Sequence, residues 1–329
     1  MRAVVFAGKL KLFRDYPMPE PAQGEALVRV QLSGICATDL EIIKGYQRFG
    51  GVLGHEFIGR VAAVNGPDQE LVGKRVVGEI NIGCGGCDFC KQGITNHCRN
   101  RQVLGIHGKD GAMADYLTLP VKNLYQVPDN VADETAVFVE PLAAACAILE
   151  QVAIKEDDRV LVLGDGKLGL LIAQVLKAVT PSVTIAGHHV AKLALADKFG
   201  IKTFFVDNLR PEKQFDVVVE ATGSPQGINV ALGQVRPRGT VVLKSTMEEG
   251  AVLNLAPVVV DEVTIVGSRC GSFAPALAAL AEGRVEVAPL VDAVYPVEQA
   301  LTALAQAGSR GALKVLVDFS SDSGDAGFH

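Results

Sequence analysis

The sequence predicts a two-domain protein of the α/β plus β class. Its 329 residues exceed what one hydrophobic core usually serves. Up to residue 148, short alternating strands such as "EALVRVQLSGIC" and "IGRVAAVNG" are separated by turn residues, a pattern typical of a barrel or sandwich. From residue 159, continuous apolar strands alternate with helices, which indicates a parallel sheet with helices on both faces.

The α/β region begins with the strand "DRVLVLG" and the helix "KLGLLIAQVLKAV", followed by the strand "SVTIAG" and the helix "VAKLALADKFG". Further apolar segments continue the sheet to about residue 270. Two more helices then precede the strand "ALKVLVDF", which could return to the first half. We therefore expect one domain over residues 1–148, joined by 288–319, and a second over 149–287. Residues 320–329, "SSDSGDAGFH", are expected to form a disordered tail.

The composition argues against several classes of function. The formal charge of −6 disfavours a general nucleic-acid binder, which needs a basic face for phosphates. No apolar run reaches the roughly 18 to 20 residues of a membrane span, and the N-terminus lacks the shape of a signal peptide. The seven cysteines are odd in number and most lie in one cluster, which favours a reducing compartment over a disulfide framework. We expect a cytoplasmic protein whose partner is a small molecule, with no nucleic acid and no membrane.

The segment "VLVLGDGKLGLL" carries the signal for a cofactor. Gly164, Gly166 and Gly169 follow a predicted strand, open a predicted helix and have the G-x-G-x-x-G spacing. In that context the first glycine makes the turn, the second admits the pyrophosphate and the third packs the helix on the strand. The diphosphate would then meet the first turn of the helix, which includes Lys167 and Leu168. The pattern predicts a dinucleotide-binding domain.

The end of the next strand bears on the choice of cofactor. About 20 residues after the glycine motif, an acid usually binds the ribose 2′-hydroxyl of NAD, but here the strand ends in Gly187. His188, His189 and Lys192 follow and would favour a 2′-phosphate. We therefore expect NADP(H) in preference to NAD(H). The alternative, that the histidines are solvated and NAD binds without the usual acid, stays open.

Four of the seven cysteines lie within "CGGCDFCKQGITNHC". Cys84, Cys87, Cys90 and Cys98 have the spacing C-x2-C-x2-C-x7-C, which is highly specific for a metal site. Four thiolates suit a closed tetrahedral zinc site, which leaves no position open for a substrate. We therefore expect a structural zinc in this loop.

A second set of residues could hold a metal that takes part in chemistry. Cys36 lies in "SGICATDLE", His55 in "LGHEFIG" and Glu140 in "VEPLAAACA". Taken singly, Cys36 is more often a small buried residue and His55 more often a structural one. Together they offer sulfur, nitrogen and oxygen, and three protein ligands with an open fourth position are the pattern of catalytic zinc.

In combination, these motifs resemble the zinc-dependent medium-chain dehydrogenases/reductases of the alcohol, polyol, glucose and threonine dehydrogenase type. The resemblance covers residues 1 to about 319 and rests on "GICATD", "GHE", the cysteine loop, "EPLA", the glycine motif and "ALKV", in the family's order. It implies a GroES-like catalytic domain made from both chain ends, with a Rossmann domain inserted between them. It also implies a nicotinamide cofactor and two zinc ions per chain, one catalytic and one structural.

The resemblance assigns roles around the catalytic zinc. It implies that Cys36, His55 and Glu140 ligate the metal. Glu56 matches the glutamate that lies behind the metal and can approach it during ligand exchange. Asp39 matches the acid that orients the ligating histidine, which fixes its tautomer and ring angle.

The resemblance also implies residues for proton transfer and cofactor binding. Thr38 matches the hydroxyl that bonds the zinc-held alcohol and passes on its proton. Glu41 stands where many relatives have a histidine at the exit of that proton path, so a carboxylate could serve there, or the path could run through the ribose and water. Lys314 falls where the family often has a basic residue near the cofactor diphosphate, and Thr222 and Gly223 lie on the nicotinamide side.

The implied activity is hydride transfer between a nicotinamide cofactor and an alcohol, polyol or sugar. A protein of another class, a zinc-binding regulatory or nucleic-acid-binding protein without dehydrogenase activity, would explain the four cysteines. It would not explain the glycine motif, and the acidic charge opposes it. The segment "LNLAPVVVDEVTIVG" could supply an edge strand for pairing between subunits, as in relatives, so we expect a homodimer or homotetramer.

Overall fold

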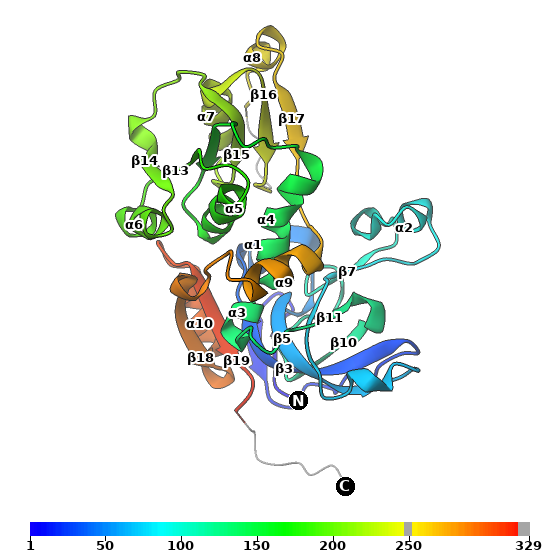
Figure 1. Ribbon diagram of the computed structural model, residues 1–329. Coiled ribbons are helices and arrows are strands. Elements are labelled where there is room, and N and C mark those ends of the chain that lie inside the picture. Colours follow the sequence, from blue (N-terminus) through cyan, green and yellow to red (C-terminus); the bar gives the residue numbers. More distant parts are fainter. Residues whose placement is uncertain (247–251, 322–329) are drawn as a thin grey trace. The chain divides into compact units, whose positions relative to one another are not determined.

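The computed structural model describes residues 1–246 and 252–321, and the chain divides into two compact units (Figure 1). The first comprises Met1–Glu140 with the C-terminal segment from Leu290, and the second comprises Pro141–Pro289. The domains expected from the sequence end at 148 and 287, whereas these boundaries fall at 140 and 289. The first boundary differs because helix α4 (Val139–Gln151) begins in one unit and continues in the other. Of the expected disordered tail, only Ser320 and Ser321 lie within the described residues.

The first unit is built mainly from β-sheets. Its largest sheet runs in the order β11-β6-β5-β3-β19-β18, with β10 also paired to β3, and two smaller sheets have the orders β2-β1-β4 and β7-β8-β9. Along β3 buried side chains alternate with more exposed ones, because one face of the strand lies on the core. The strands are β1 (Ala3–Phe6), β2 (Leu10–Phe13), β3 (Glu25–Gly34), β4 (Gly51–Val52), β5 (Glu56–Val64), β6 (Arg75–Gly78), β7 (Asn81–Ile82), β8 (Gln102–Leu104), β9 (Gly108–Lys109), β10 (Tyr116–Pro120), β11 (Leu124–Gln126), β18 (Val291–Pro296) and β19 (Lys314–Asp318).

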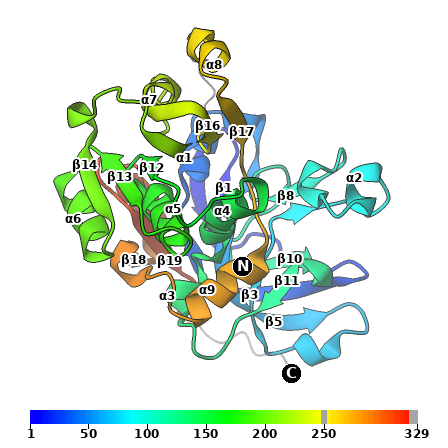
Figure 2. The same ribbon diagram turned by 45° about the horizontal axis from the view of Figure 1, so that its top comes forward.

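Short helices join the strands of this unit. They are α1 (Ala37–Ile43), α2 (Asp88–Lys91), α3 (Asp133–Ala136) and α10 (Ala300–Ala307). Helix α1 starts directly after β3, and α2 lies in a loop that projects beyond strands β7 and β8 in both views (Figures 1 and 2). The segment "ALKVLVDF" forms β19 and pairs with β3, so the C-terminal strand does return to the first unit.

The second unit contains a parallel sheet in the order β14-β13-β12-β15-β16-β17. Its central strand β12 is fully buried, as expected for a strand covered on both faces. The strands are β12 (Val160–Leu163), β13 (Val183–Gly187), β14 (Lys202–Phe205), β15 (Phe215–Glu220), β16 (Val235–Leu243) and β17 (Thr264–Gly267). The remaining helices are α5 (Lys167–Lys177), α6 (Val190–Lys198), α7 (Gly227–Gln234), α8 (Ala256–Val260) and α9 (Phe273–Ala281).

The strand order of this sheet reverses at β12. Strands β13 and β14 lie on one side of it, and β15, β16 and β17 lie on the other. Figure 2 shows β13 and β14 on one side of β12 and β16 and β17 on the other. Helices α5 and α6 pack on β12, β13 and β14, and α7 packs on β15 and β16. In sheets of this kind, ligands bind beyond the carboxyl ends of the strands at the point of reversal. Within the described residues, no helix has the length and apolar character needed to cross a membrane.

Candidate active site

Antiparallel pairing of β3 with β5 brings two separate parts of the sequence together. Gly34, the last residue of β3, lies opposite Glu56, the first residue of β5. Cys36 and His55 therefore extend from neighbouring strand ends. One ligand atom from each of Cys36, His55 and Glu56 lies within 4.8 Å of the others. The structure thus groups a sulfur, a nitrogen and an oxygen, the donor types of a zinc site.

Asp39 faces the ring of His55. Its Oδ1 lies 3.3 Å from His55 Nδ1, within ion-pair range but off the line of a hydrogen bond. Asp39 is itself held in place, because Oδ2 accepts the N–H of Cys36 at 2.8 Å and Oδ1 accepts the N–H of Gly54 at 3.2 Å. Since Nδ1 faces this carboxylate, Nε2 is the nitrogen available to a metal. This is the geometry that an orienting role of Asp39 requires.

The charges around His55 suit the site to a cation. Burial disfavours the imidazolium form, but the negative groups of Asp39 and Cys36 outweigh burial and raise the pKa of His55 well above its ordinary value. The two buried side chains, His55 and Asp39, are 3% and 0% exposed. A zinc ion would supply positive charge among these same groups in place of the proton. The donor set and its burial therefore fit a zinc ion.

Glu56 forms a buried ion pair with Lys314. Lys314 opens β19, which pairs with β3 on the side away from β5, so the Glu56 side chain has to cross β3. It crosses at Gly34, where a Cβ atom would lie 2.5 Å from Glu56 Oε2. Burial opposes the charge of Lys314, but attraction by Glu56, Cys36 and Glu140 outweighs it and raises the pKa of Lys314.

This pairing differs from the position expected for Lys314. The resemblance implies a basic residue near the cofactor diphosphate, whereas the Lys314 ammonium lies between Glu56 and the carbonyl of Ile35. It also lies 5.6 Å from the ring centroid of Phe138. The Lys314 side chain is 0% exposed. In this structure its charge therefore compensates that of Glu56 and does not face a phosphate at the surface.

Thr38, Glu140 and Glu41 occupy different surroundings. Thr38 lies at the start of α1, with Oγ1 3.8 Å from Cys36 Sγ. Glu140 stands in the first turn of α4, outside the group of three clustered ligands, although its charge acts on the buried lysine. Glu41 is exposed and forms a 2.8 Å ion pair with Lys44. Its contact in this structure is therefore with a surface lysine.

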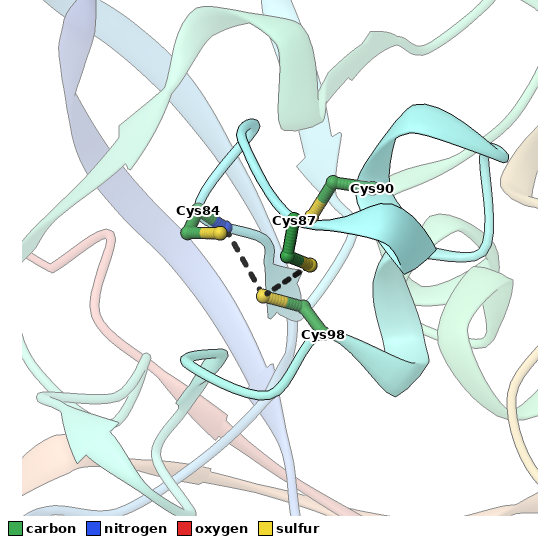
Figure 3. A group of neighbouring side chains, drawn as sticks. All are labelled: Cys84, Cys87, Cys90 and Cys98. Atoms are coloured by element: carbon green, nitrogen blue, oxygen red, sulfur yellow. Dashed lines mark hydrogen bonds between the residues drawn. The ribbon is translucent and has the colours of Figure 1, made fainter.

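The four cysteines predicted as zinc ligands gather around α2 (Figure 3). Their sulfur atoms all lie within 4.8 Å of one another. The N–H of Cys84 donates to Cys98 Sγ at 3.3 Å, and Cys87 Sγ lies 3.7 Å from the same sulfur. All seven cysteines of the chain are free of disulfides.

The protonation of these thiols also fits a metal site. Hydrogen bonds from the backbone N–H groups of residues 86 and 87 lower the pKa of Cys84, and the one from Cys90 helps to lower that of Cys87 to about 6. Loss of solvation raises the pKa of Cys90 to about 11. Since the thiolate is the form that binds metal, the lowered pKa values of Cys84 and Cys87 suit these two positions to zinc.

A cavity of about 700 Å³ lies elsewhere in the first unit. Tyr16, Phe49, His107 and Asp110 are among its lining residues, and none of the grouped ligands Cys36, His55 and Glu56 lines it. The position of this cavity therefore gives no reason to connect it with the group of Cys36, His55 and Glu56.

In the second unit, the glycine motif forms the turn between β12 and α5. Gly164 has a φ of +113°, in the left-handed region, and a Cβ there would strike the backbone of Ala221. Gly166 is the N-cap of α5, and no side chain caps this helix end. The half-buried Lys167 and Leu168 follow in its first turn. Exposed N–H groups at a helix start suit a diphosphate, as the sequence predicts.

The residues after β15 lie at the same edge of the sheet. The N–H and Oγ1 of Thr222 donate to Glu220 Oε1 at 2.8 and 2.5 Å, and the N–H of Gly223 donates to Ser245 Oγ at 2.8 Å. Strands β12 and β15 pair in parallel up to Leu163 and Glu220, so the Thr222–Gly223 turn adjoins the glycine turn. This is the edge at which a dinucleotide binds in such sheets.

A carboxylate stands at the end of β13, contrary to the expectation from the sequence. It belongs to Asp165, the second residue of the glycine turn. Asp165 Oδ2 accepts the N–H groups of His188 at 2.8 Å and His189 at 2.7 Å, and His189 Nδ1 lies 3.0 Å from Oδ1. A Cβ on Gly187 would overlap the Asp165 side chain. The premise that no acid occupies this position is therefore wrong, because the acid comes from another turn.

The basic residues after β13 are less available to a phosphate than the sequence suggests. His188 is exposed, but His189 pairs with Asp165 and Lys192 is only 8% exposed. Asp165 is thus the site residue that sequence reasoning missed. The signal that could have found it was an acid within the glycine motif itself.

A glycine turn at the reversal point of a parallel sheet, in a chain that also carries two clusters of zinc-type ligands, defines a dehydrogenase of the zinc-binding class. Comparisons with known proteins agree. Residues 22–129 match the alcohol dehydrogenase GroES-like domain, and residues 168–282 match the zinc-binding dehydrogenase domain. D-arabinitol dehydrogenase 1 of Uromyces fabae is 31% identical over 314 residues, which cover 89% of this chain and 89% of that protein.

Solved structures are similar over nearly the whole chain. Alcohol dehydrogenase TADH from Thermus sp. ATN1 has a TM-score of 0.88 and 29% identity, covering 97% of this chain and 99% of its own. An alcohol dehydrogenase (rspB) from Escherichia coli CFT073, complexed with NADH, has a TM-score of 0.87 and 27% identity with the same coverage. The chain belongs to the family of zinc-binding medium-chain dehydrogenases. The predicted GroES-like and Rossmann folds are confirmed, and an oxidoreductase acting on alcohols or polyols is favoured over the regulatory alternative.

Proposed function

We propose that this chain is a zinc- and nicotinamide-dependent dehydrogenase that interconverts an alcohol, polyol or sugar with the corresponding carbonyl compound. The observation that carries the proposal is the group formed by the partly exposed Cys36 and the buried His55 and Glu56, in a chain that also has a dinucleotide turn. The relative from Uromyces fabae supports a polyol as one substrate class, since its name describes a dehydrogenase of D-arabinitol.

The residues of the first unit would hold the metal and move the proton. Cys36, His55 and Glu140 would ligate the catalytic zinc, with Glu56 placed to approach it. A bound zinc supplies a Lewis acid that lowers the pKa of an alcohol. Thr38, whose Oγ1 lies 3.8 Å from Cys36 Sγ, would act as a relay: it would accept the alcohol proton and pass its own hydroxyl proton on toward solvent. Hydride transfer then requires the alcohol to be held as its alkoxide.

Two charged residues, Asp39 and Lys314, contact the proposed metal-binding residues His55 and Glu56. Asp39 faces His55 Nδ1 and so directs Nε2 toward the metal position. Lys314 compensates the negative charge of Glu56 in a place that excludes water. Without it, Glu56 would be a buried anion with a strong tendency to take up a proton. We propose that Lys314 keeps Glu56 ionised and therefore able to act as a ligand.

The second unit would hold the cofactor. A bound nicotinamide accepts the hydride, and the protein positions it. The turn of Gly164, Gly166 and Gly169 would receive the diphosphate, while Thr222 and Gly223 would lie beside the nicotinamide. Each of these groups lies at the carboxyl edge of the parallel sheet.

We propose a second zinc at Cys84, Cys87, Cys90 and Cys98, which makes two zinc ions per chain. Four thiolates complete a tetrahedral shell, so this metal has no position for a substrate. Its role would be to close the loop around α2.

The sequence-based preference for NADP(H) depends on an uncharged end of β13. Asp165 removes that basis, and His188 is the exposed basic residue that still supports the preference. We therefore propose a nicotinamide dinucleotide as the cofactor.

We also propose that the chain assembles as a homodimer or homotetramer through the edge of its parallel sheet. Strand β17 is the last strand of that sheet. Nearby, Leu255, Val259 and Val260 are 56%, 76% and 78% exposed, and a second copy would cover them. A cytoplasmic location, without nucleic-acid or membrane partners, stays a prediction from the sequence.

The test of the proposed function is a substrate panel with both cofactors. Alcohols, polyols, sugars and threonine are assayed with NAD⁺ and NADP⁺ by following the absorbance of the reduced nicotinamide. We expect turnover of at least one class, and loss of that turnover in a His55→Ala variant that is still folded at the assay temperature. Turnover that persists in folded His55→Ala would contradict the assignment of this site.

A further inference from the structure

We infer that Asp165 recognises the adenosine ribose of the cofactor and directs this enzyme to NAD(H) in preference to NADP(H). The inference rests on the proposed function and deepens its cofactor site. Its starting point is the position of one carboxylate, which reaches the end of β13 from the glycine turn.

The pairing of β12 with β13 explains how Asp165 reaches that position. Leu163 lies beside Ala186 at the carboxyl ends of the two strands. Asp165 and Gly187 follow them directly, and a Cβ atom on Gly187 would overlap Cβ, Cγ and Oδ2 of Asp165. The space that a side chain at the end of β13 would occupy therefore holds the Asp165 carboxylate. An acidic side chain is therefore present at the end of β13, although it comes from the turn after β12.

The Asp165 carboxylate is held in one orientation. Its Oδ2 accepts two backbone N–H groups, from His188 at 2.8 Å and His189 at 2.7 Å. The His189 ring adds a third contact, with Nδ1 3.0 Å from Oδ1 and 3.1 Å from Oδ2. The side chain is 8% exposed. Charge-assisted bonds of this kind are strong, so the negative charge stays at this point when a nucleotide binds.

A fixed negative charge at this place selects a hydroxyl over a phosphate. A ribose 2′-hydroxyl can donate to a carboxylate, as in dinucleotide folds whose acid follows the second strand. A 2′-phosphate would bring like charge to the same place, which is unfavourable. Because His189 Nδ1 faces Asp165, Nε2 is the ring nitrogen left to form a hydrogen bond with a second ribose hydroxyl. Asp165 and His189 together therefore match an unphosphorylated ribose.

Isothermal titration calorimetry of the 329-residue chain with NADH and NADPH tests this inference without any assay of turnover. A hydrogen bond to a charged group corresponds to a factor of about ten or more in affinity. We expect the wild type to bind NADH at least about tenfold more tightly than NADPH. Asp165→Asn should reduce this Kd ratio by about tenfold. Asp157→Asn, which neutralises an exposed acid before β12, is the matched control and should leave the ratio unchanged.

A double variant separates recognition of the ribose from a purely structural role. Asp165→Gly should lose the preference for NADH. Adding Gly187→Asp restores a carboxylate at the end of β13, and the first change removes the atoms that a side chain at 187 would strike. The double variant should recover the NADH preference, whereas a structural brace to His188 and His189 would not be recovered.

Three results would overturn the inference. These are a wild type that binds NADPH more tightly than NADH, an unchanged Kd ratio in Asp165→Asn, and a double variant that folds but does not regain the NADH preference. A wild type that binds neither nucleotide would instead overturn the proposed function. The two failures are therefore distinguishable.

Discussion

The two clusters of metal-type ligands in this chain are assembled in opposite ways. All four cysteines of the first cluster lie in a single loop that begins at Cys84 and ends at Cys98. Cys36, His55 and Glu56 come from the ends of different strands and meet only through the register of β3 with β5. The first site is therefore encoded by local spacing, and the second by the topology of a sheet.

The surroundings of the two clusters differ as well. Cys84 is exposed, and the cysteine loop relies on backbone N–H groups to favour thiolate. His55 and Glu56 are buried, and each faces a charged partner, Asp39 and Lys314 respectively. A buried site with compensated charges can stabilise developing charge in a reaction, whereas a loop closed by four sulfurs cannot receive a substrate. The comparison assigns chemistry to one cluster and loop stability to the other.

The largest effect is expected from Cys36→Ser. Removal of this thiolate should displace the catalytic zinc and reduce kcat/KM by about a thousandfold or more, since a Lewis acid contributes several kcal/mol to the barrier. The melting temperature should change little, because Cys36 is a partly exposed residue at the end of a strand. A variant that keeps activity within about tenfold of wild type would remove Cys36 from the mechanism.

The next effect concerns the buried pair of Glu56 and Lys314. Lys314→Met leaves a buried carboxylate without its partner and should destabilise the first unit by about 3–5 kcal/mol, as measured by urea unfolding. The double variant Lys314→Met with Glu56→Gln should regain much of this free energy, because no unpaired charge is left. Equal destabilisation of the single and double variants would show that packing, and not charge, sets the cost.

A smaller effect is expected from the cysteine loop. Cys98→Ser should release the structural zinc and lower the melting temperature by roughly 10 °C, since the metal contributes to folding of the loop around α2. In a sample that is still folded at the assay temperature, kcat should stay within about twofold of wild type. The zinc content and the melting curve of the same preparation provide the measurement. A loss of turnover at full zinc occupancy of the other site would contradict the separation of the two clusters.

The smallest effect is expected from Glu41→Gln. Glu41 is exposed and pairs with Lys44, an arrangement of surface charges that contributes roughly 0–1 kcal/mol. If Glu41 does not carry the alcohol proton to solvent, kcat and its pH profile should match those of wild type. A shifted pH profile with an unchanged melting temperature would instead support Glu41 as the exit of the proton path.

The residues that could be predicted from sequence are those whose role depends on spacing along the chain. The cysteine loop and the glycine turn are of this kind, and the structure brings their members together as expected. Cys36 and His55 required a further step, since their proximity comes from the β3–β5 pairing. Family resemblance supplied that step, because the order of the motifs carries information about topology that no single motif contains.

The residues that could not be predicted are those whose partners come from another strand. Asp165 lies over Gly187 because β12 and β13 are neighbours. The acid is visible within the glycine motif, but its position at the end of β13 follows only from the pairing of the two strands. Lys314 turns to Glu56 because β19 and β5 flank β3, with Gly34 as the point of crossing. In both cases a glycine, Gly187 or Gly34, leaves room for a carboxylate from another strand or turn. The sequence shows the glycine but does not show which side chain occupies the space.

Zinc content measured together with turnover tests the central claim most directly. The zinc content of wild type, Cys98→Ser and Cys36→Ser is measured by elemental mass spectrometry. The turnover of each is measured with the best substrate of the panel. The two ligand clusters predict two zinc ions in the wild type and one in each variant, with turnover retained in Cys98→Ser and lost in Cys36→Ser. A single zinc in the wild type, or the reverse pattern of activity in the two variants, would contradict the account.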